Sequence, residues 1–243
     1  MEVPLGMRLF ARRSGAREYN KLAYTDLREW IKQLEKAGEL KRIREAVSPY
    51  LEMAEIADRT AKLGRGTAAA GGSALLFENV TGFPGAKVLM NQFGSERRMK
   101  LALETDSLDA IAHRIRTLIK PEMPTSFMDK LKLLPMLAEV GSFFPKVIAA
   151  KDAACKQVIH RALADGGQGI DLLKLPVLTT WPQDGGPFIT LPCVITRDPT
   201  SGKRNVGMYR MQVYDGQTTG MHWQRQKVAA EHLRDRLRAA TET

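Results

Sequence analysis

Apolar residues between positions 25 and 38 recur with the spacing of one face of an α-helix. Thr25 or Asp26 can cap the first turn of this helix. Gly38 can end it in the left-handed conformation that glycine adopts without strain. The apolar positions stand at i, i+3, i+4 and i+7 and are Leu27, Trp30, Ile31 and Leu34. The pattern predicts an amphipathic helix.

Similar patterns predict further elements before residue 120. Ser48 and Pro49 can cap and open a second helix, which should run to about Lys62 and stop near Gly64. The Gly- and Ala-rich stretch 64–73 is typical of a loop, because it lacks the strand-before, helix-after setting of a phosphate-binding motif. The remaining predicted elements are strands at 39–43, 74–77 and 87–90 and helices at 95–104 and 107–119.

Prolines interrupt the stretch from 120 to 154, which we expect to link two regions and to hold a short helix from about Phe127 to Leu134. After about Cys155, alternating apolar residues predict strands at 172–175, 189–196, 206–213 and 218–223. Clusters of turn residues divide these strands, as in an antiparallel sheet or a small barrel. Helical spacing of apolar residues then predicts a last helix that begins near Lys227.

The whole pattern predicts an α+β fold with a change of character along the chain. We expect a flexible N-terminus at 1–22 and an α/β region at 23–120. A proline-containing linker follows at 121–154, and an antiparallel β domain ending in a helix occupies 155–243.

Composition narrows the class of protein. A chain of 243 residues, 44% hydrophobic and 26% charged, can bury a substantial core. No apolar run approaches the roughly 20 residues that span a bilayer. Cys155 and Cys193 are the two cysteines, which is typical of reduced thiols in a cytoplasmic protein. We expect Cys193, in an apolar run, to be a core residue.

The net charge of +10 admits several interpretations. It favours an anionic partner, such as nucleic acid, a membrane surface or a phosphate-bearing cofactor. A solvated basic surface explains the charge equally simply. Because the charges are scattered and no nucleic-acid module is recognisable, a basic nucleic-acid-binding protein is kept as an alternative and not as the main hypothesis.

Candidate chemistry gathers between Asn205 and Arg210. The Asn205 side-chain oxygen is a hard ligand that suits Mg²⁺ or Mn²⁺, particularly beside phosphate oxygens. The fork of donors on Arg210 can hold a carboxylate, although an arginine paired with a surface acid is the commoner case. Their odd spacing places them on opposite faces of a regular strand. Both can serve one site only if Asn205 precedes the strand or a bulge intervenes.

A second polar run follows from His222 to Lys227. His222, Gln224 and Gln226 alternate along one face of an extended segment. His222 can contact a flavin or act as an acid–base group, although a lone histidine in a strand is more often structural. Gln226 can offer an oxygen to a metal. Lys227 opens the last helix, whose free N–H groups form a natural anion site.

At these residues the chain resembles the UbiD family of prenylated-flavin-dependent decarboxylases. The resemblance covers nearly the whole chain and is specific, because several separated motifs occur in the family's order. These motifs are Leu27 to Leu40, Leu76 to Asn79, Leu175 to Leu178, Trp181 to Pro187, Asn205 to Arg210 and Met221 to Gln224.

The resemblance implies a fold, a reaction and a set of site residues. The β domain would be a flavin-binding split barrel. The reaction would be reversible decarboxylation of an aromatic or α,β-unsaturated acid, with prenylated FMN, Mn²⁺ and often K⁺ as cofactors. Arg210 would be catalytic and orient the substrate carboxylate. The implied cofactor contacts are Met208, Tyr209, Arg210, His222, Trp223, Gln224, Lys227 and Val228, and the implied metal ligands are Asn205 and Gln226.

Two departures from the family pattern bear on the site. Many members carry histidine where this chain has Gln226, and a glycine pair where it has Val228 and Ala229. Glutamine still offers oxygen to a metal, whereas the alanine methyl can crowd a phosphate. The family's glutamate metal ligand and catalytic acids would fall beyond Thr243. We therefore expect an N-terminal portion of such an enzyme, with weak or no turnover by itself.

The leading hypothesis is a UbiD-like decarboxylase acting on a 4-hydroxybenzoate-like acid, polyprenylated if the pathway leads to a quinone. Its partners would be a flavin prenyltransferase that supplies the cofactor and further subunits, in a homo-oligomer or with a second chain. The expected location is the cytoplasm, at a membrane if the substrate is polyprenylated. The alternative within the family is a non-catalytic flavin-binding or assembly subunit of a split decarboxylase.

Overall fold

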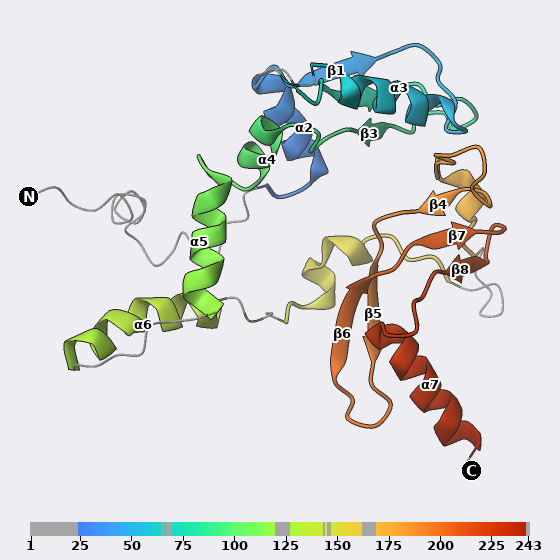
Figure 1. The fold of residues 1–243 in the computed structure, drawn as a ribbon. Coiled ribbons are helices and arrows are strands. Elements are labelled where there is room, and N and C mark those ends of the chain that lie inside the picture. Colours follow the sequence, from blue (N-terminus) through green and yellow to red (C-terminus); the bar gives the residue numbers. More distant parts are fainter. Residues whose placement is uncertain are drawn as a thin grey trace, which may run out of the picture. The chain divides into compact units, whose positions relative to one another are not determined.

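The structure, a computed structural model, describes residues 24–64, 66, 70–119, 127–142, 144, 147–161 and 169–241 (Figure 1). The predicted flexible N-terminus at 1–22 lies outside these residues. The chain divides into two compact units. The first joins residues 1–38 to 96–158, and the second joins 39–95 to 159–243. The domain boundaries expected from the sequence stay predictions.

The first unit begins with helix α2, Leu27–Lys36, as the apolar pattern predicts. The Asp26 carboxylate accepts hydrogen bonds from two N–H groups of the first turn and caps the helix. Trp30 and Leu34 are buried. Gly38, at a φ of +70°, follows the last turn.

Among the described residues of this unit, three further helices and two short 3₁₀ turns follow α2. They are α4 (Glu96–Ala102), α5 (Leu108–Ile119), α6 (Phe127–Ser142), η1 (Ala150–Asp152) and η2 (Ala154–Lys156). The Tyr24 hydroxyl donates to the Leu101 carbonyl, and the Arg97 guanidinium donates to the Ala37 carbonyl. Helix α6 is longer than predicted, because it continues through Pro135. Proline removes one helical hydrogen bond, and the neighbouring residues keep the helix.

The second unit opens with a mixed sheet of order β1-β2-β3. Its strands are β1 (Leu40–Ile43), β2 (Ala74–Phe77) and β3 (Val88–Met90), all at the predicted positions. Strand β1 pairs with β2 in parallel and β3 pairs with β2 antiparallel. Helix α3 (Glu52–Lys62) lies between β1 and β2 in the sequence, so these three elements form a βαβ unit.

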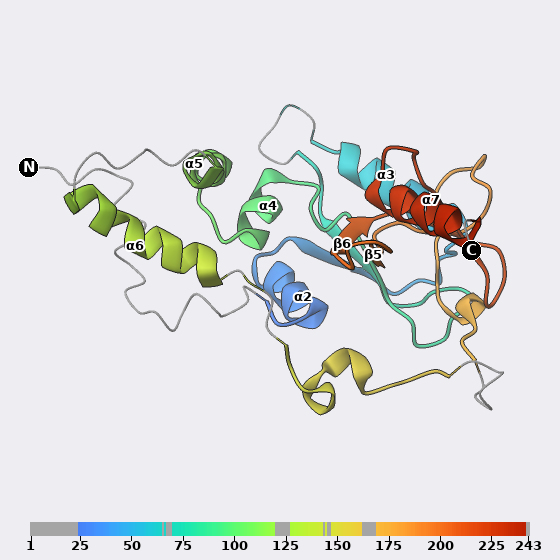
Figure 2. The same cartoon turned by 90° about the horizontal axis from the view of Figure 1, so that it is seen from below.

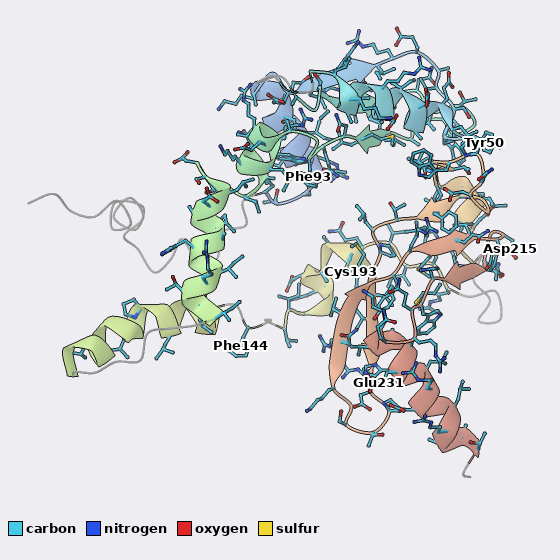
Figure 3. The ribbon with its side chains drawn as sticks, in the orientation of Figure 1. Tyr50, Phe93, Phe144, Cys193, Asp215 and Glu231 are labelled. Carbon is cyan, nitrogen blue, oxygen red and sulfur yellow. The ribbon has the colours of Figure 1, made fainter. Side chains whose placement is uncertain are left out.

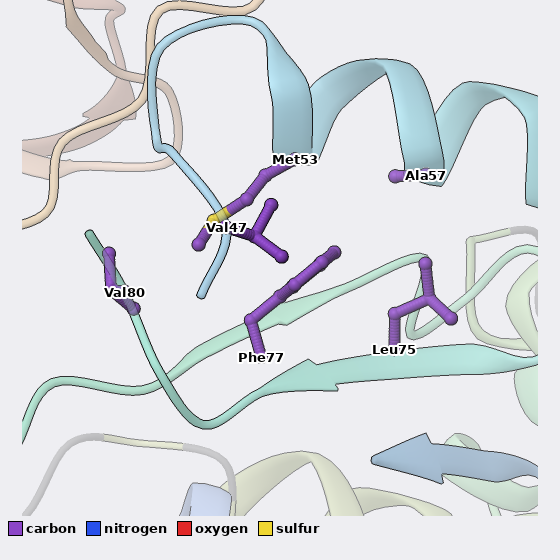
Figure 4. Packing of buried hydrophobic residues seen from close by; sticks show 6 residues of the cluster. All are labelled: Val47, Met53, Ala57, Leu75, Phe77 and Val80. Carbon is purple, nitrogen blue, oxygen red and sulfur yellow. The ribbon is translucent and has the colours of Figure 1, made fainter. Parts of the chain in front are cut away.

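The core of this unit lies between α3 and the sheet (Figure 4). Met53 and Ala57 point from the helix toward Leu75 and Phe77 on β2. Met53 and Phe77 are fully buried. Val47 and Val80 close the cluster from the adjoining loops. Strand β2 is buried along its whole length, as expected for a central strand.

Helix α3 begins later than the predicted start at Ser48 and Pro49. Leu51 stands before its first residue at a φ of +61°, so the regular helix starts at Glu52. The Ser48 backbone still takes part, because its N–H donates to the Glu52 carboxylate and its carbonyl accepts from Met53. Ser48 and Pro49 therefore form the entry turn and not the cap and first turn.

Two small antiparallel sheets and a helix follow (Figures 1 and 2). One sheet has the order β4-β7-β8, and the other pairs β5 with β6. Helix α7 lies against β5 and β6. The bounds are β4 (Phe188–Ile189), β5 (Cys193–Arg197), β6 (Arg204–Met208), β7 (Met211–Val213), β8 (Thr219–Met221) and α7 (Val228–Thr241).

Three strand predictions in this region need correction. The strand expected at 172–175 is a 3₁₀ turn, η4 (Leu172–Lys174), capped by the Asp171 carboxylate. The strand expected at 189–196 is split near Pro192, which has no N–H to donate. The strand expected at 206–213 is split at Tyr209 and Arg210. Each split lets the chain pass from one sheet to the other, and the described strands do not close into a barrel.

The β5–β6 pair has one covered face and one exposed face. Val194 and Thr196 are half-buried, whereas their neighbours Cys193 and Ile195 are exposed. The expectation that Cys193 is a core residue is therefore wrong for the described structure (Figure 3). In the described part of the chain, no helix combines the length and apolar character needed to cross a membrane.

Candidate functional site

Strand β6 presents alternate residues to α7. Asn205 and Gly207 are half-buried and Tyr209, just beyond the strand, is buried, whereas Val206 and Met208 are exposed. The period of two explains this alternation. Asn205 stands opposite Thr196 of β5 in the strand register. The candidate metal ligand therefore belongs to the face covered by the last helix.

A polar contact joins this face to α7. The Thr196 hydroxyl lies 3.0 Å from His232 Nδ1 on the helix. Asp198, just beyond the same strand, has a pKa held below its ordinary value, chiefly by the Ser201 hydroxyl and the Thr200 N–H, with a smaller contribution from His232. The turn beyond β5 thus keeps a negative charge near an otherwise basic helix.

Arg210 lies where β6 gives way to β7. Its guanidinium carbon stands 4.1 Å from the centre of the Phe188 ring on β4, within cation–π range. Because β6 ends at Met208 and β7 begins at Met211, Asn205 and Arg210 do not share one regular strand. The argument that odd spacing places them on opposite faces of one strand therefore does not apply to this pair.

A backbone hydrogen bond and a ring contact join the segment from Asn205 to Arg210 to the segment from His222 to Lys227. The His222 N–H donates to the Arg210 carbonyl at 2.9 Å. The rings of Tyr209 and Trp223 lie 6.4 Å apart, centre to centre, at a tilt of 59°. These contacts place the residues beyond β8 beside the break between β6 and β7, although they stand more than ten positions later in the sequence.

A short turn leads from this contact into α7. The Lys227 N–H donates to the Gln224 carbonyl at 2.9 Å, and Gln226 Nε2 donates to Gln224 Oε1 at 2.9 Å. In the helix, the Ala229 N–H donates to the Tyr209 hydroxyl at 3.1 Å. The Gln226 amide oxygen takes no part in the hydrogen bond to Gln224 and can coordinate a cation.

Most of the predicted site residues are joined by these contacts. They are Tyr209, Arg210, His222, Trp223, Gln224, Gln226 and Lys227. Val228 is the first residue of α7 and is 40% exposed. Met208 is 62% exposed on the other face of β6.

The sequence motif Trp181 to Pro187 braces the same region. The Asp184 N–H donates to the Trp181 carbonyl and closes a turn. Gln212 Nε2 on β7 then donates to the Gly185 carbonyl at 2.7 Å. A Cβ at Gly185 would lie 2.8 Å from that nitrogen, so the glycine leaves room for the Gln212 amide.

Four residues of this corner escaped prediction: Phe188, Thr196, Gly207 and His232. Their roles depend on the register between strands and on how the last helix packs, and local spacing carries neither. The small size of Gly207, two residues before an aromatic on the same face, was the one local signal. Among the described residues, no group of three histidine, cysteine, aspartate or glutamate side chains could hold a metal.

Comparison with known proteins identifies the class. Residues 31–116 match the 3-octaprenyl-4-hydroxybenzoate carboxy-lyase N-terminal domain, and residues 146–243 match the Rift-related domain of the same enzymes. The chain belongs to the UbiD family. An uncharacterized protein of Archaeoglobus fulgidus is 51% identical over 213 residues, which are 88% of this chain and 40% of that protein.

Solved structures agree with this assignment. The evolved dimeric form of the UbiD-class enzyme HmfF from Pelotomaculum thermopropionicum, in complex with prFMN, aligns with a TM-score of 0.66 and 27% identity over 89% of this chain and 42% of that one. Vanillic acid decarboxylase of Sedimentibacter hydroxybenzoicus, in its closed form, aligns with a TM-score of 0.63 and 29% identity over 86% and 39%. The chain thus spans about 40% of the length of these relatives.

Proposed function

We propose that this chain is the flavin-binding portion of a decarboxylase that removes CO₂ from an aromatic or α,β-unsaturated acid with prenylated FMN. The observation that carries the proposal is the corner in which Arg210, Tyr209 and the start of α7 meet. Membership of the UbiD family supports it, as does the bound prFMN of the HmfF structure.

In the proposed site, Arg210 holds the substrate carboxylate. Its stacking on Phe188 restricts where the guanidinium can lie, so less freedom is lost when a carboxylate binds. The exposed side of the guanidinium keeps its donors open to a bidentate partner. The prenylated flavin would supply the electron sink for loss of CO₂, and the chain's own part is to place the acid beside it.

The residues around α7 fit the phosphate end of the cofactor. The first N–H groups of a helix lack partners within the helix and carry partial positive charge. Lys227, immediately before the helix, adds an exposed ammonium group. We propose that Lys227 and Val228 approach the phosphate, that His222, Trp223 and Gln224 line the flavin, and that Met208 and Tyr209 contribute from the β6 side.

The donor set fits a hard divalent cation in part. Asn205 and Gln226 offer neutral amide oxygens, which Mn²⁺ and Mg²⁺ accept. Two neutral ligands leave the ion's charge uncompensated, so we propose that phosphate oxygens complete the shell. We propose that a further, charged ligand comes from the part of the relatives that this chain does not cover. Mn²⁺, K⁺ and the split barrel of the family stay proposals for this chain.

We propose the substrate class from the family. A 4-hydroxybenzoate-like acid, polyprenylated if it belongs to a quinone pathway, suits the matched carboxy-lyase domains. The name of vanillic acid decarboxylase, which is 29% identical, gives an acid of this kind as its substrate. A flavin prenyltransferase would have to supply the cofactor.

The decisive experiment is coexpression with a prenylated-flavin synthase in medium containing Mn²⁺, followed by absorption spectroscopy and mass measurement of the purified protein. We expect about one bound cofactor per chain, which requires that Asn205 to Val228 form a working site. Protein that is folded by circular dichroism but free of flavin would overturn the proposal for the isolated chain.

Two matched variants sharpen this test. Lys227→Ala should weaken FMN binding about tenfold, because a charge-assisted contact contributes about 1.5 kcal/mol or more. Lys203→Ala removes another exposed lysine, from the turn between β5 and β6, and should leave binding unchanged. Equal weakening by both variants would point to general charge attraction and not to a phosphate site.

A second candidate is a non-catalytic flavin-binding or assembly subunit of a split decarboxylase. It is favoured by one observation, the coverage of only about 40% of the relatives' length. Affinity purification from the native source decides between the two. A stoichiometric partner that carries the remaining UbiD sequence would support the split enzyme, and a homo-oligomer with full turnover would exclude it.

A further inference from the structure

Tyr209 has a role in this structure that its place in the motif does not reveal. Its side chain is only 5% exposed, and its hydroxyl accepts the N–H of Ala229 at 3.1 Å. Ala229 is itself 1% exposed. The bond therefore joins two buried groups, one at the end of β6 and one in the first turn of α7, where competing water is excluded.

Gly207 makes this bond possible. A Cβ built at Gly207 would lie 2.5 Å from Tyr209 Cε2 and 3.1 Å from the hydroxyl oxygen. The tyrosine ring thus lies across the strand at the glycine, in space that any side chain would fill. The requirement is one of room and not of backbone conformation. Gly207 and Tyr209 act as a pair on the face of β6 that also carries Asn205.

The bond falls where the proposed phosphate site needs order. The first turn of α7 is held on one side by Tyr209 and on the other by the Lys227 N–H, which donates to Gln224. Since Tyr209 already satisfies the Ala229 N–H, that group is withheld from an anion, and the direction of the remaining N–H groups is set.

We propose that Tyr209 is a positioning residue that fixes the N-terminus of α7 for the cofactor phosphate, and that Gly207 is needed to let its ring pass. The phosphate part of this inference rests on the proposed function, whereas the link between tyrosine and helix does not. The Tyr209 side chain acts through Ala229 and does not itself touch the phosphate.

The test begins with Tyr209→Phe, which removes the hydroxyl and keeps the ring. Amide hydrogen exchange, resolved by NMR for each residue, should show Ala229 exchanging about tenfold faster, because one net hydrogen bond is lost. Tyr50→Phe makes the same change at a side chain that is 62% exposed and should leave Ala229 unchanged. Unchanged Ala229 exchange in Tyr209→Phe would overturn the inference.

Gly207→Ala provides a second, independent variant. We expect it to accelerate Ala229 exchange in the wild-type background, because the ring must move and carry the hydroxyl away. It should have a much smaller effect on Ala229 in the Tyr209→Phe background, where that bond is already absent. Additive effects of the two substitutions would mean that Gly207 acts by another route and would overturn the pairing.

FMN binding in the presence of Mn²⁺ tests whether the bond from Tyr209 to α7 helps the helix to bind the cofactor phosphate. Tyr209→Phe should raise the Kd of FMN about tenfold, and Tyr50→Phe should not change it. Faster Ala229 exchange with an unaltered Kd would overturn the positioning role. If the wild-type chain binds no FMN, the proposed function fails and the phosphate part of this inference fails with it, while the exchange data still decide the link from tyrosine to helix.

Discussion

Glu78 forms ion pairs with three basic side chains at one end of the β1–β2–β3 sheet. Its carboxylate lies 2.7 Å from Arg42 Nη1, 3.1 Å from Lys87 Nζ and 3.9 Å from Arg44 Nε. The hydrogen bond from Lys87 is the main cause that holds the pKa of Glu78 below its ordinary value of 4.5, with Arg42 also lowering it. These cations come from the segments next to β2 on either side, so the carboxylate ties the strand ends together.

This arrangement predicts a dependence of stability on acid. Because the folded-state pKa of Glu78 is lowered, its contribution is complete above about pH 4.5 and is lost as the pH falls through the folded-state pKa. Tm measured from about pH 6 to pH 3 should therefore fall more steeply in the wild type than in Glu78→Gln. Glu55→Gln, at an exposed helical pair, is the control, and a wild-type slope matched by Glu78→Gln would contradict the prediction.

Gly71 shows how one missing side chain can decide local packing. Its φ is +93°, and a Cβ there would stand 1.8 Å from the Gly94 carbonyl oxygen. We expect Gly71→Ala to destabilise the protein by about 3 kcal/mol, through clash added to backbone strain. Gly82→Ala is the control, since Gly82 has a φ of +84° and no atom within 4 Å, and should cost about 1 kcal/mol. Urea unfolding of both variants measures the difference, and equal losses would refute the steric argument.

Single residues also show how far sequence reasoning reached. Asn205, Arg210 and Lys227 could be selected because their chemistry is legible in a motif. Phe188 under Arg210 could not, since it stands 22 positions earlier and meets the arginine only through the β4–β7 register. Local spacing does not single out His232 either, because its partner Thr196 lies on another element.

At the scale of elements, helix α3 contributes Met53 and Ala57 to the core of the second unit. Met53 is fully buried against the sheet. Met53→Ala should destabilise by about 3 kcal/mol, the sum of lost burial and the cavity left behind. Leu63→Ala, just past the same helix and 61% exposed, should change stability by less than about 0.5 kcal/mol. Denaturant unfolding compares the two, and a small loss at Met53 would show that the core refills the space.

Helices were easier to foresee than strands for a physical reason. A helix such as α2 satisfies its hydrogen bonds locally, so its apolar spacing and its cap at Asp26 suffice. The strands after residue 188 depend on partners elsewhere in the chain. Each of two continuous apolar runs therefore predicts a single strand, although the chain changes sheet midway in each, at Pro192 and at Tyr209–Arg210.

For the whole molecule, the change of character along the sequence did not reveal that each compact unit is built from two separate stretches. Local patterns report what each segment can form and not which distant segment it meets. The family assignment was accessible from sequence because several separated motifs keep their order, and the matched domains at 31–116 and 146–243 confirm it.

Coverage of about 40% of the relatives' length leads to a prediction for the whole chain. Loaded with prenylated FMN and Mn²⁺, it should decarboxylate 4-hydroxybenzoate-like acids weakly or not at all. We propose that the acid that protonates the product lies in the part of the relatives that this chain does not cover, and loss of such a group typically costs 10²–10⁴-fold in rate. Product formation should be followed by chromatography, after bound flavin has been quantified.

The comparison needs a full-length UbiD enzyme loaded in the same way, and free cofactor as the blank. Similar turnover per bound flavin in the isolated chain and the full-length enzyme would contradict the prediction, because Arg210 and its neighbours would then suffice without further acids. Bound flavin with little turnover would mean that this chain binds the cofactor and places the substrate acid, whereas another part of the enzyme protonates the product.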